Sequence, residues 1–384
     1  MPRIAEHNET ILLYYLQTVK PMLKNQKKLA LTLLAGTSYL VSLTGMMQVL
    51  PQAQAQTPAP QSSNGTLSPN DPAAKLDPAL VNVPAIQAPK GDSSQNGTNS
   101  SAPVRTISFD LKTGQTQESA SLPATTSATS ASVSGPSMGL SPNVVAEPRA
   151  GVPLPTSGVQ PNSVIGADNR IKITDTTSYP WRTATKLIVT FPKAKGGCTG
   201  TIIAAKYVLT AGHCVYNKSY GGWAKKIEVI PGLKGTYKPY GSAFATKVRS
   251  YTSWTSSQKS DYDIALITLD KSIGNTTGWL GYAYYPSING VTGNITGYPG
   301  DKDNGLYPYY HYGSIASSTS YRLSYQIDTS GGQSGSGIYY KTGDKRYVFG
   351  VHTNGTSSPT GYNSGTRLDS KKVNDIKSWI TSGK

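Results

Sequence analysis

The sequence has few cysteines and an uneven supply of aromatic residues, and both features restrict the fold. Two cysteines in 384 residues exclude a disulfide-dense miniature scaffold and a four-cysteine zinc site. All five tryptophans lie beyond residue 180, and Phe109 is the only aromatic residue between Gln56 and Asn162. The middle third of the chain therefore cannot build a large core, although the length would otherwise suggest roughly two or three domains.

The only long apolar run lies near the start of the chain. Residues 29–43 follow a group of lysines and precede Ala53-Gln54-Ala55, which is the pattern of a secretory signal peptide. The run is shorter than the roughly 20 apolar residues of a membrane-spanning helix. We expect residues 1–55 to be removed, with Met1 or Met22 as the start, and the mature protein to be secreted, extracellular and free of the membrane.

Residues 56–162 are dominated by Pro, Ser, Thr, Ala, Gln and Asn. Such a composition buries too little apolar surface to offset the entropy of ordering the chain, so this region is expected to be largely disordered. It is interpreted as a low-complexity pro-segment that is cut away on maturation. A flexible linker is the alternative.

Beyond residue 163 the composition changes to short β-branched and aromatic runs separated by turn residues, which predicts an antiparallel β-barrel or sandwich. One helix is predicted near the C-terminus, where Ser370 can act as N-cap and Val373, Ile376 and Ile380 form an apolar stripe. The predicted strands lie at 186–191, 201–203, 207–210, 226–230, 263–269, 337–340 and 347–351.

The first candidate segment for chemistry runs from Cys198 to Cys214 and includes His213. In an exported chain the two cysteines are expected to form one disulfide, worth about 3 kcal/mol in the chain-entropy model. His213 beside it is either a structural histidine or a catalytic one.

Two further segments carry a carboxylate and a hydroxyl. Asp263 stands at the start of an apolar strand, where a buried carboxylate needs a donor such as a histidine N–H; Asp261 is the rival, and each alone is more typical of a turn. Residues 328–337 form a glycine-dense turn with Ser334 at its centre. Its glycines allow backbone N–H groups to converge, as an oxyanion requires, although a lone Gly-Ser pattern is usually a flexible loop.

Together the motifs Thr-Ala-Gly-His-Cys, Asp-Ile-Ala-Leu and Gly-x-Ser-Gly resemble those of the chymotrypsin-like serine proteases. The resemblance implies a double six-stranded antiparallel β-barrel with a C-terminal helix at residues 163–384, divided at about 270/271. It also implies a catalytic triad of His213, Asp263 and Ser334, with an oxyanion hole formed by the N–H groups of Gly332 and Ser334.

Other motifs are similar to those of the bacterial glutamyl endopeptidases, namely those at residues 163–170, 297–302, 331–336 and 351–355. In that family a histidine, a threonine and the amino terminus of the mature chain hold the carboxylate of the residue before the scissile bond (P1). Here these positions correspond to His352 and Thr329, with Ser163 or Val164 as the terminus. Gln333 replaces the Asp that precedes the nucleophile in the animal enzymes, so the familiar ion pair with a new amino terminus cannot form there.

The resemblance is physically coherent, because a buried substrate carboxylate needs donors and positive charge. No amine exists at Ser163 until the bond after Asn162 is cut, so removal of the pro-segment would complete the site. We therefore expect a serine endopeptidase that cleaves after Glu, and less well after Asp, and is activated by loss of its pro-segment. The alternatives are a different P1 preference and an extracellular binding or adhesion protein on an inactive protease fold.

The charge of the chain is strongly basic, with 36 Lys and Arg against 20 Asp and Glu. Such a field can attract protein or peptide substrates that carry acidic residues, or it can hold the enzyme on an anionic cell surface. The basic residues are scattered and form no recognised module, which argues against nucleic-acid binding. Apart from these substrates, the expected partner is the chain's own pro-segment before maturation; we expect a monomer with no cofactor and no metal ion.

Overall fold

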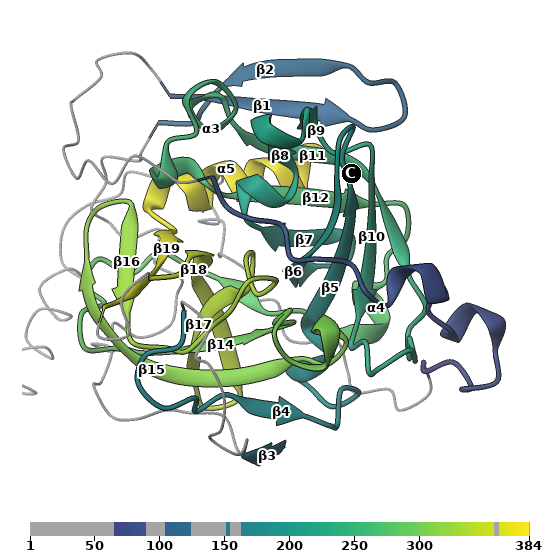
Figure 1. The fold of residues 1–384 in the computed structure, drawn as a ribbon. Helices are drawn as coiled ribbons and strands as arrows, with labels where there is room; N and C mark the ends of the chain where they lie inside the picture. Colours follow the sequence, from purple (N-terminus) through teal and green to yellow (C-terminus); the bar gives the residue numbers. More distant parts are fainter. Residues whose placement is uncertain (1–64, 90–103, 124–150, 154–162, 357–360, 384) are drawn as a thin grey trace, which may run out of the picture. The chain divides into compact units, whose positions relative to one another are not determined.

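The computed structural model describes residues 65–89, 104–123, 151–153, 163–356 and 361–383. Most of these residues build two closed antiparallel β-barrels of six strands each (Figure 1). The predicted all-β double barrel is therefore confirmed. The expected signal peptide at residues 1–55 lies outside the described residues. Among the helices of the described residues, none has the length and apolar character needed to cross a bilayer.

The first barrel has the strand order β10-β5-β6-β7-β12-β11 and is closed by pairing between β11 and β10. Its strands are β5 (Ala184–Thr190), β6 (Lys195–Ala204), β7 (Tyr207–Thr210), β10 (Lys226–Pro231), β11 (Ala243–Tyr251) and β12 (Ala265–Leu269).

The second barrel has the order β14-β17-β18-β19-β16-β15 and is closed by pairing between β15 and β14. Its strands are β14 (Thr292–Gly297), β15 (Tyr309–Ser318), β16 (Arg322–Tyr325), β17 (Gly337–Thr342), β18 (Lys345–Asn354) and β19 (Asn363–Arg367).

The alternation of side chains along each strand explains how the barrels fill. In β5, Leu187 and Val189 point into the core of the first barrel, whereas Ile188 lies on the other face in a separate apolar cluster with Tyr298. Successive residues of a strand face opposite sides of the sheet, so the side chains of β5 pack on both faces.

Short elements connect the strands. β8 (Tyr216–Asn217) pairs with β9 (Gly222–Trp223), and β13 (Gly281–Tyr282) pairs in parallel with β18. The remaining helical turns are η3 (Trp181–Thr183), η4 (Gly212–Cys214), η5 (Lys218–Tyr220), α3 (Thr252–Ser257), η6 (Ser260–Tyr262), α4 (Gly274–Thr277) and η7 (Asp303–Gly305).

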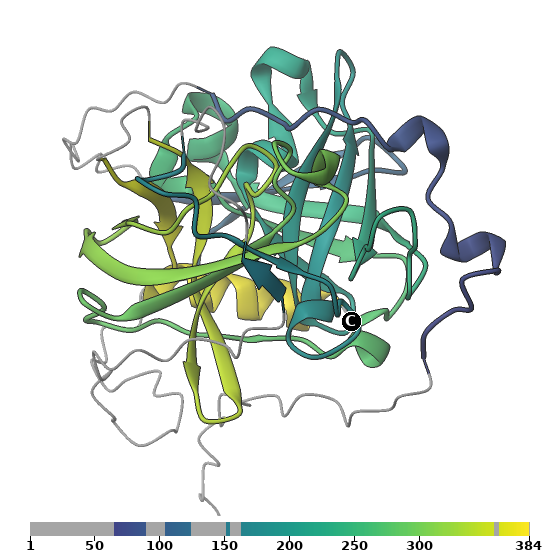
Figure 2. The same ribbon diagram turned by 60° about the horizontal axis from the view of Figure 1, so that its bottom comes forward.

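Each end of the protease region packs on the barrel formed by the other half of the sequence. β4 (Ile171–Ile173) pairs with β15 of the second barrel. The C-terminal helix α5 (Ser370–Ser382) is the yellow helix in Figure 2. Its residues Ile376 and Trp379 belong to the core of the first barrel. A division at 270/271 therefore separates the two barrels, but β4 and α5 each lie on the barrel formed by the other half of the sequence.

The predicted helix α5 is present, but its cap differs from the prediction. Asp369 is the N-cap, and its carboxylate accepts the backbone N–H of Lys372 at 2.8 Å. Ser370 is the first helical residue. A carboxylate at this position also interacts favourably with the positive end of the helix dipole, which a serine hydroxyl does less well.

Three stretches of the region 56–162 are ordered on the barrels, so the expectation of disorder does not hold for them. They contain η1 (Pro72–Ala74), η2 (Pro78–Leu80), the hairpin β1 (Arg105–Asp110) with β2 (Thr116–Ala120), and β3 (Gly151–Pro153). β1 pairs with β11, and β3 pairs with β4. These segments lack a core of their own, and their order comes from sheet edges and apolar surface of the barrels.

Candidate active site

The three candidate catalytic residues lie at strand ends of the two barrels. His213 is in η4, which follows β7, and Asp263 stands between η6 and β12. Ser334 lies in the turn that connects β16 and β17 of the second barrel. Segments far apart in the sequence therefore meet where strands of the first barrel face a turn of the second.

Asp263 holds His213 by two hydrogen bonds. Its Oδ2 lies 2.8 Å from Nδ1 of the imidazole, and its Oδ1 accepts the backbone N–H of His213 at 2.9 Å. Both side chains are buried. Asp261, the rival carboxylate, makes no hydrogen bond to His213 within the described residues, so the geometry favours Asp263.

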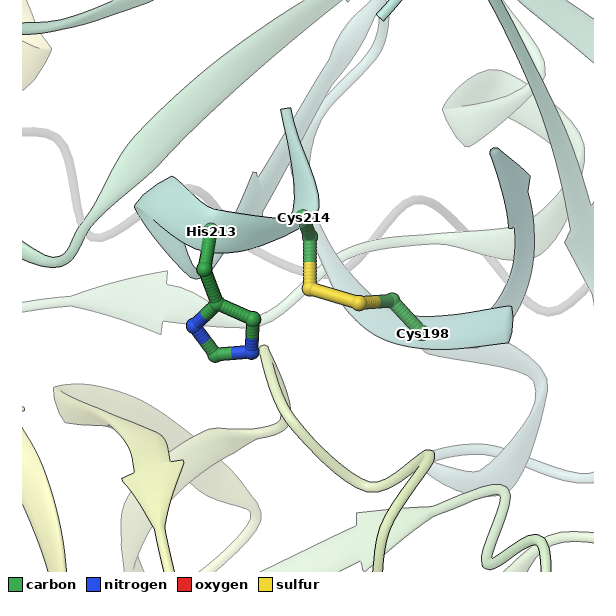
Figure 3. A group of neighbouring side chains, drawn as sticks. All are labelled: Cys198, His213 and Cys214. Carbon is green, nitrogen blue, oxygen red and sulfur yellow. A yellow bond between two sulfur atoms is a disulfide. The ribbon is translucent and has the colours of Figure 1, made fainter. Parts of the chain in front are cut away.

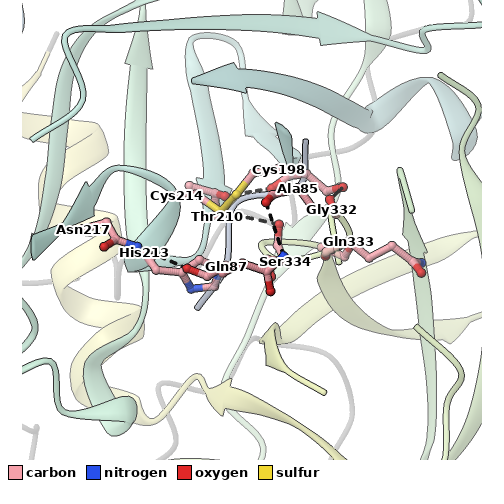
Figure 4. The surroundings of a disulfide bond; sticks show 12 residues. Ala85, Gln87, Cys198, Thr210, His213, Cys214, Asn217, Gly332, Gln333 and Ser334 are labelled. Carbon is pink, nitrogen blue, oxygen red and sulfur yellow. Dashed lines mark hydrogen bonds between the residues drawn. A yellow bond between two sulfur atoms is a disulfide. The ribbon is translucent and has the colours of Figure 1, made fainter. Parts of the chain in front are cut away.

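Ser334 is tied to the first barrel through its backbone. Its carbonyl oxygen accepts the N–H of Thr199 at 2.9 Å, and Sγ of Cys214 lies 3.6 Å from the same oxygen. Ser334 therefore lies beside the residue that follows His213, and Figure 4 shows both side chains in this region. Nε2 of His213 is buried and has no hydrogen-bond partner in the described parts of the chain. An unpaired imidazole nitrogen of this kind can accept a proton from a hydroxyl.

The turn around Ser334 depends on a glycine with a positive φ. Gly332 has a φ of 97°, and a Cβ there would lie 2.6 Å from the carbonyl oxygen of Tyr298. The hydroxyl of Thr199 donates to the carbonyl of Gly332 at 2.8 Å. Across the described segments, the N–H groups of Gly332 and Ser334 have no hydrogen-bond partner. Unpaired donors of this kind can bind an oxyanion.

A disulfide joins Cys198 and Cys214 beside the histidine, as predicted, with a Cα–Cα distance of 6.1 Å (Figure 3). Ligand atoms of Cys198, His213 and Cys214 lie within 4.8 Å of one another, a spacing that can suggest a metal site. The two sulfurs are bonded to each other, however, so neither is the thiolate that binds a metal. The disulfide instead anchors the loop that carries His213.

A buried cation, Arg170, lies near the turn that carries Ser334. Its guanidinium donates to both carboxylate oxygens of Asp168, at 2.9 and 2.8 Å, and to both of Asp301, at 3.0 and 2.6 Å. A longer contact of 3.5 Å reaches Oε1 of Gln333, which also accepts the N–H of Ser330 at 2.9 Å. Although burial acts against its charge, the hydrogen bonds that its guanidinium donates to Asp168 and Asp301 raise the pKa of Arg170.

Ser163, Thr329 and His352, the residues expected to bind the P1 carboxylate, lie in or against the turn that carries Ser334. Ser163 lies against the turn through its carbonyl, which accepts the N–H of Thr329 at 3.2 Å and an amide N–H of Asn363 at 2.6 Å. Thr329 is fully buried, and its hydroxyl has no partner in the described residues. His352 exchanges backbone hydrogen bonds with Gly335 and Ser336 on either side of the same turn. Val164 is buried next to Ser163.

The imidazole of His352 is uncharged in this environment. Burial, together with the nearby His213 and Arg322, lowers its pKa to about 3. Its Nδ1 lies 2.7 Å from the hydroxyl of Tyr325, and burial raises the pKa of that phenol. The hydroxyl therefore keeps its proton and can donate it to Nδ1.

Comparison with known proteins assigns the chain to a family. The family model described as Trypsin matches residues 171–380. The chain belongs to the trypsin family. It is a serine endopeptidase, and its described residues have the chymotrypsin-like double barrel of that family.

Two named relatives of this serine endopeptidase come from Bacillus species. Glutamyl endopeptidase of Bacillus licheniformis is 42% identical over 226 residues, which cover 57% of this chain and 70% of the relative. A Bacillus subtilis protein named extracellular metalloprotease is 40% identical over 226 residues, covering 58% and 71% of the two chains. A solved Glu endopeptidase in complex with MPD is 33% identical, with a TM-score of 0.52, and covers 57% of this chain and 99% of its own.

Three residues of the site were not identified from the sequence. The sequence pointed to Arg170 only as the last residue of the motif at 163–170. Nothing in the sequence pointed to Tyr325 apart from its place in an aromatic-rich region. Asp328 accepts the N–H groups of Ile165 and Asn169, both at 2.9 Å, and so holds the segment that begins at Ser163. The only sequence feature that pointed to a role for Asp328 was its position at the start of the Ser334 turn.

Proposed function

We propose that this serine endopeptidase is secreted and hydrolyses peptide bonds after glutamate, and less well after aspartate, through an acyl-enzyme intermediate. Ser334 is the nucleophile, His213 is the general base and later the acid, and Asp263 orients the imidazole. The observation that carries these roles is the pair of hydrogen bonds from His213 to Asp263, with the other ring nitrogen unpaired beside Ser334.

The reaction follows from these positions. Oγ of Ser334 attacks the carbonyl carbon while Nε2 of His213 takes its proton, and the proton is then given to the departing amine. Water next attacks the acyl ester with the same imidazole as base. The N–H groups of Gly332 and Ser334 bind the oxyanion, and loss of one such donor typically costs on the order of 3 kcal/mol.

The P1 carboxylate is bound by three groups: the unpaired hydroxyl of Thr329, His352 and the amino group of the mature chain. When Tyr325 donates to Nδ1, the proton of the neutral His352 ring lies on Nε2, which can then donate to the substrate. The positive charge comes from the amine. It forms at Ser163, which already contacts Thr329 in the uncut chain, or at Val164 if the cut falls one residue later.

Preference for glutamate over aspartate depends on one methylene, which is worth only about 1–3 kcal/mol. Cleavage after aspartate is therefore slower but present. Residues 163–384 contain 26 Lys and Arg against 12 Asp and Glu, a net charge of +14, which attracts acidic substrates to the cleft.

Maturation proceeds in two cuts. The signal peptide, residues 1–55, is removed on export, and the pro-segment, residues 56–162, is removed to create the amine at Ser163. The mature enzyme is then residues 163–384.

The test uses the secreted protein and chromogenic peptides with Glu, Asp, Gln or Leu at P1. We expect hydrolysis after Glu, abolished in Ser334→Ala, and amino-terminal sequencing that begins at Ser163 or Val164. His352→Leu should remove the preference for Glu over neutral residues. Equal hydrolysis by wild type and Ser334→Ala would refute the enzyme mechanism, whereas an unchanged preference in His352→Leu would refute only the specificity site.

A further inference from the structure

Residues 65–89, which belong to the proposed pro-segment, are docked on the protease. The N–H of Leu76 donates to the carbonyl of Thr236 at 2.7 Å, and the N–H of Lys238 donates to the carbonyl of Ala74 at 2.6 Å. Leu76 is 4% exposed. It shares an apolar cluster with residues of both barrels, namely Ile188, Ile230, Leu233, Tyr298 and Leu306.

Residues 84–87, here called the cleft segment, continue from this docked part and pair with β6. The N–H of Gly197 donates to the carbonyl of Pro84 at 2.7 Å, and the N–H of Ile86 donates to the carbonyl of Gly197 at 3.0 Å. Ile86 is 2% exposed and joins the apolar core of the first barrel. A methyl group on Gly196 would overlap the Ile86 side chain, so the missing side chain of this glycine makes room for Ile86.

The cleft segment lies against the catalytic turn and the loop of His213. The Cβ of Ala85 would lie 3.2 Å from a Cβ built on Gly331, which is in the same turn as Ser334. The carbonyl of Gln87 accepts the side-chain N–H of Asn217 at 3.2 Å. Figure 4 shows Ala85 and Gln87 among the residues around the disulfide, next to His213 and Ser334.

The cleft segment covers the leaving-group side of the site. Among the described residues it makes no hydrogen bond to Ser163, Thr329 or His352, the proposed P1 site. It contacts Gly197 instead, which adjoins the disulfide at Cys198. When the P1 carboxylate of a substrate is bound at Thr329, the substrate residues after the scissile bond must lie on the surface that the cleft segment occupies.

The direction of the cleft segment is opposite to that of a substrate. β6 runs toward Ser334, because Thr199 lies after Gly197 and donates to the carbonyl of Ser334. Ala85 and Gly197 form a parallel bridge, so the cleft segment also runs toward Ser334. Substrate residues beyond the scissile bond run away from the nucleophile. A reversed chain occupies the same surface without presenting a correctly oriented peptide bond for attack.

We infer that the cleft segment is a built-in inhibitor that blocks the leaving-group side of the active site in reverse orientation. This inference rests on the proposed function. Its contacts in the described residues include those with Gly197, Asn217 and Gly331, so cutting after Asn162 creates the amine of the P1 site but leaves these contacts in place. Activation then has a second step, the release of residues 65–89, and the released peptide rebinds as an inhibitor in trans.

The first test compares the full chain with Ile86→Asp, which places a carboxylate in an apolar site, and Asn82→Asp, a matched charge at an exposed position. The readouts are the rate at which diisopropyl fluorophosphate labels Ser334 and the hydrogen exchange of the Gly197 and Ile86 amides. We expect Ile86→Asp to label at least about tenfold faster than wild type and to lose amide protection, while Asn82→Asp matches wild type.

Equal labelling of wild type and Ile86→Asp, or rapid exchange of both amides in wild type, would overturn the inference. The exchange measurement does not depend on catalysis. Protected amides in a protein whose Ser334 never reacts would support the docked segment and refute the proposed nucleophile, so the two failures are distinguishable.

The second test adds a synthetic peptide of residues 65–89 to the processed enzyme. We expect inhibition that competes with substrates extended beyond the scissile bond, weakened at least about tenfold by Ile86→Asp in the peptide and unchanged by Asn82→Asp. Equal inhibition by all three peptides, or inhibition by none, would contradict release and rebinding of this segment.

Discussion

The carboxylate of Asp263 holds His213 at two points, with Oδ1 on the backbone N–H at 2.9 Å and Oδ2 on Nδ1 of the ring at 2.8 Å. The first contact fixes the position of the backbone, and the second fixes the orientation of the imidazole. Because both residues are buried, water cannot replace either hydrogen bond. The proton of the neutral ring is thereby kept on Nδ1, which leaves Nε2 able to accept a proton.

Asp263→Asn should therefore abolish most activity without disrupting the fold. The amide oxygen can still accept the backbone N–H of His213, but the amide nitrogen would face Nδ1 and favour the tautomer that cannot accept a proton at Nε2. We expect kcat to fall by about 10⁴-fold on a Glu-containing peptide. Asp261→Asn is the matched control and should change kcat by less than about twofold, since Asp261 does not touch the ring in the described residues. Retention of most activity in Asp263→Asn would contradict the triad.

Tyr325→Phe should weaken recognition of the P1 carboxylate. The loss of the hydroxyl leaves Nδ1 of His352 buried without a partner and frees the ring to adopt the wrong tautomer. We expect kcat/KM for Glu substrates to fall about tenfold, mainly through KM, and kcat/KM for neutral P1 residues to stay the same. Tyr340→Phe removes a hydroxyl from the same barrel core and serves as control. A uniform loss across all P1 residues would instead indicate a structural role for Tyr325.

The depressed pKa of His352 makes stability depend on pH. This histidine titrates near 6.5 in the unfolded chain but at about 3 in the folded protein, where burial opposes its charge. The unfolded state therefore binds more protons between these two values. The free energy of unfolding should fall as the pH falls from about 6.5 toward 3, by about 1.4 kcal/mol per pH unit for this residue.

Urea unfolding of wild type and His352→Asn at a series of pH values measures this contribution. Below pH 6.5 the free energy of unfolding of the variant should depend less steeply on pH than that of wild type. The difference in slope should correspond to about one proton. The pKa of His311 is also lowered by burial, and His311 contributes equally in both proteins. Identical slopes for the two proteins would show that His352 is accessible to protons in the folded state.

Arg170→Met should destabilise the protein strongly. It leaves Asp168, which is 5% exposed as a side chain, and the partly buried Asp301 without their guanidinium. Breaking a buried ion pair by removing one partner costs about 3–5 kcal/mol, which urea unfolding can measure. Lys302→Met removes a partly exposed lysine 3.4 Å from Asp168 and should cost less than about 1 kcal/mol. Similar losses in both variants would argue against a special role for the buried arginine.

Much of the fold and the site could be predicted because the relevant information is local in the sequence. Short β-branched and aromatic runs predicted strands of a barrel or sandwich. The residues that flank His213, Asp263 and Ser334 carried the resemblance to the serine proteases, and this resemblance implied the double barrel. The disulfide followed from there being only two cysteines. The identity of the helix cap could not be read in the same way, because Asp369 and Ser370 are both good caps and adjacent.

The sequence by itself determined which residues could perform chemistry, since the residue types and their neighbours within each motif do not depend on the rest of the chain. Only the tertiary structure decided how distant segments meet. It paired Asp263 rather than Asp261 with His213, enclosed Arg170 between two carboxylates, and laid residues 84–87 parallel to β6. Contacts of this kind depend on which sheet edge and which apolar surface remain open after the barrels close, and no local pattern encodes that.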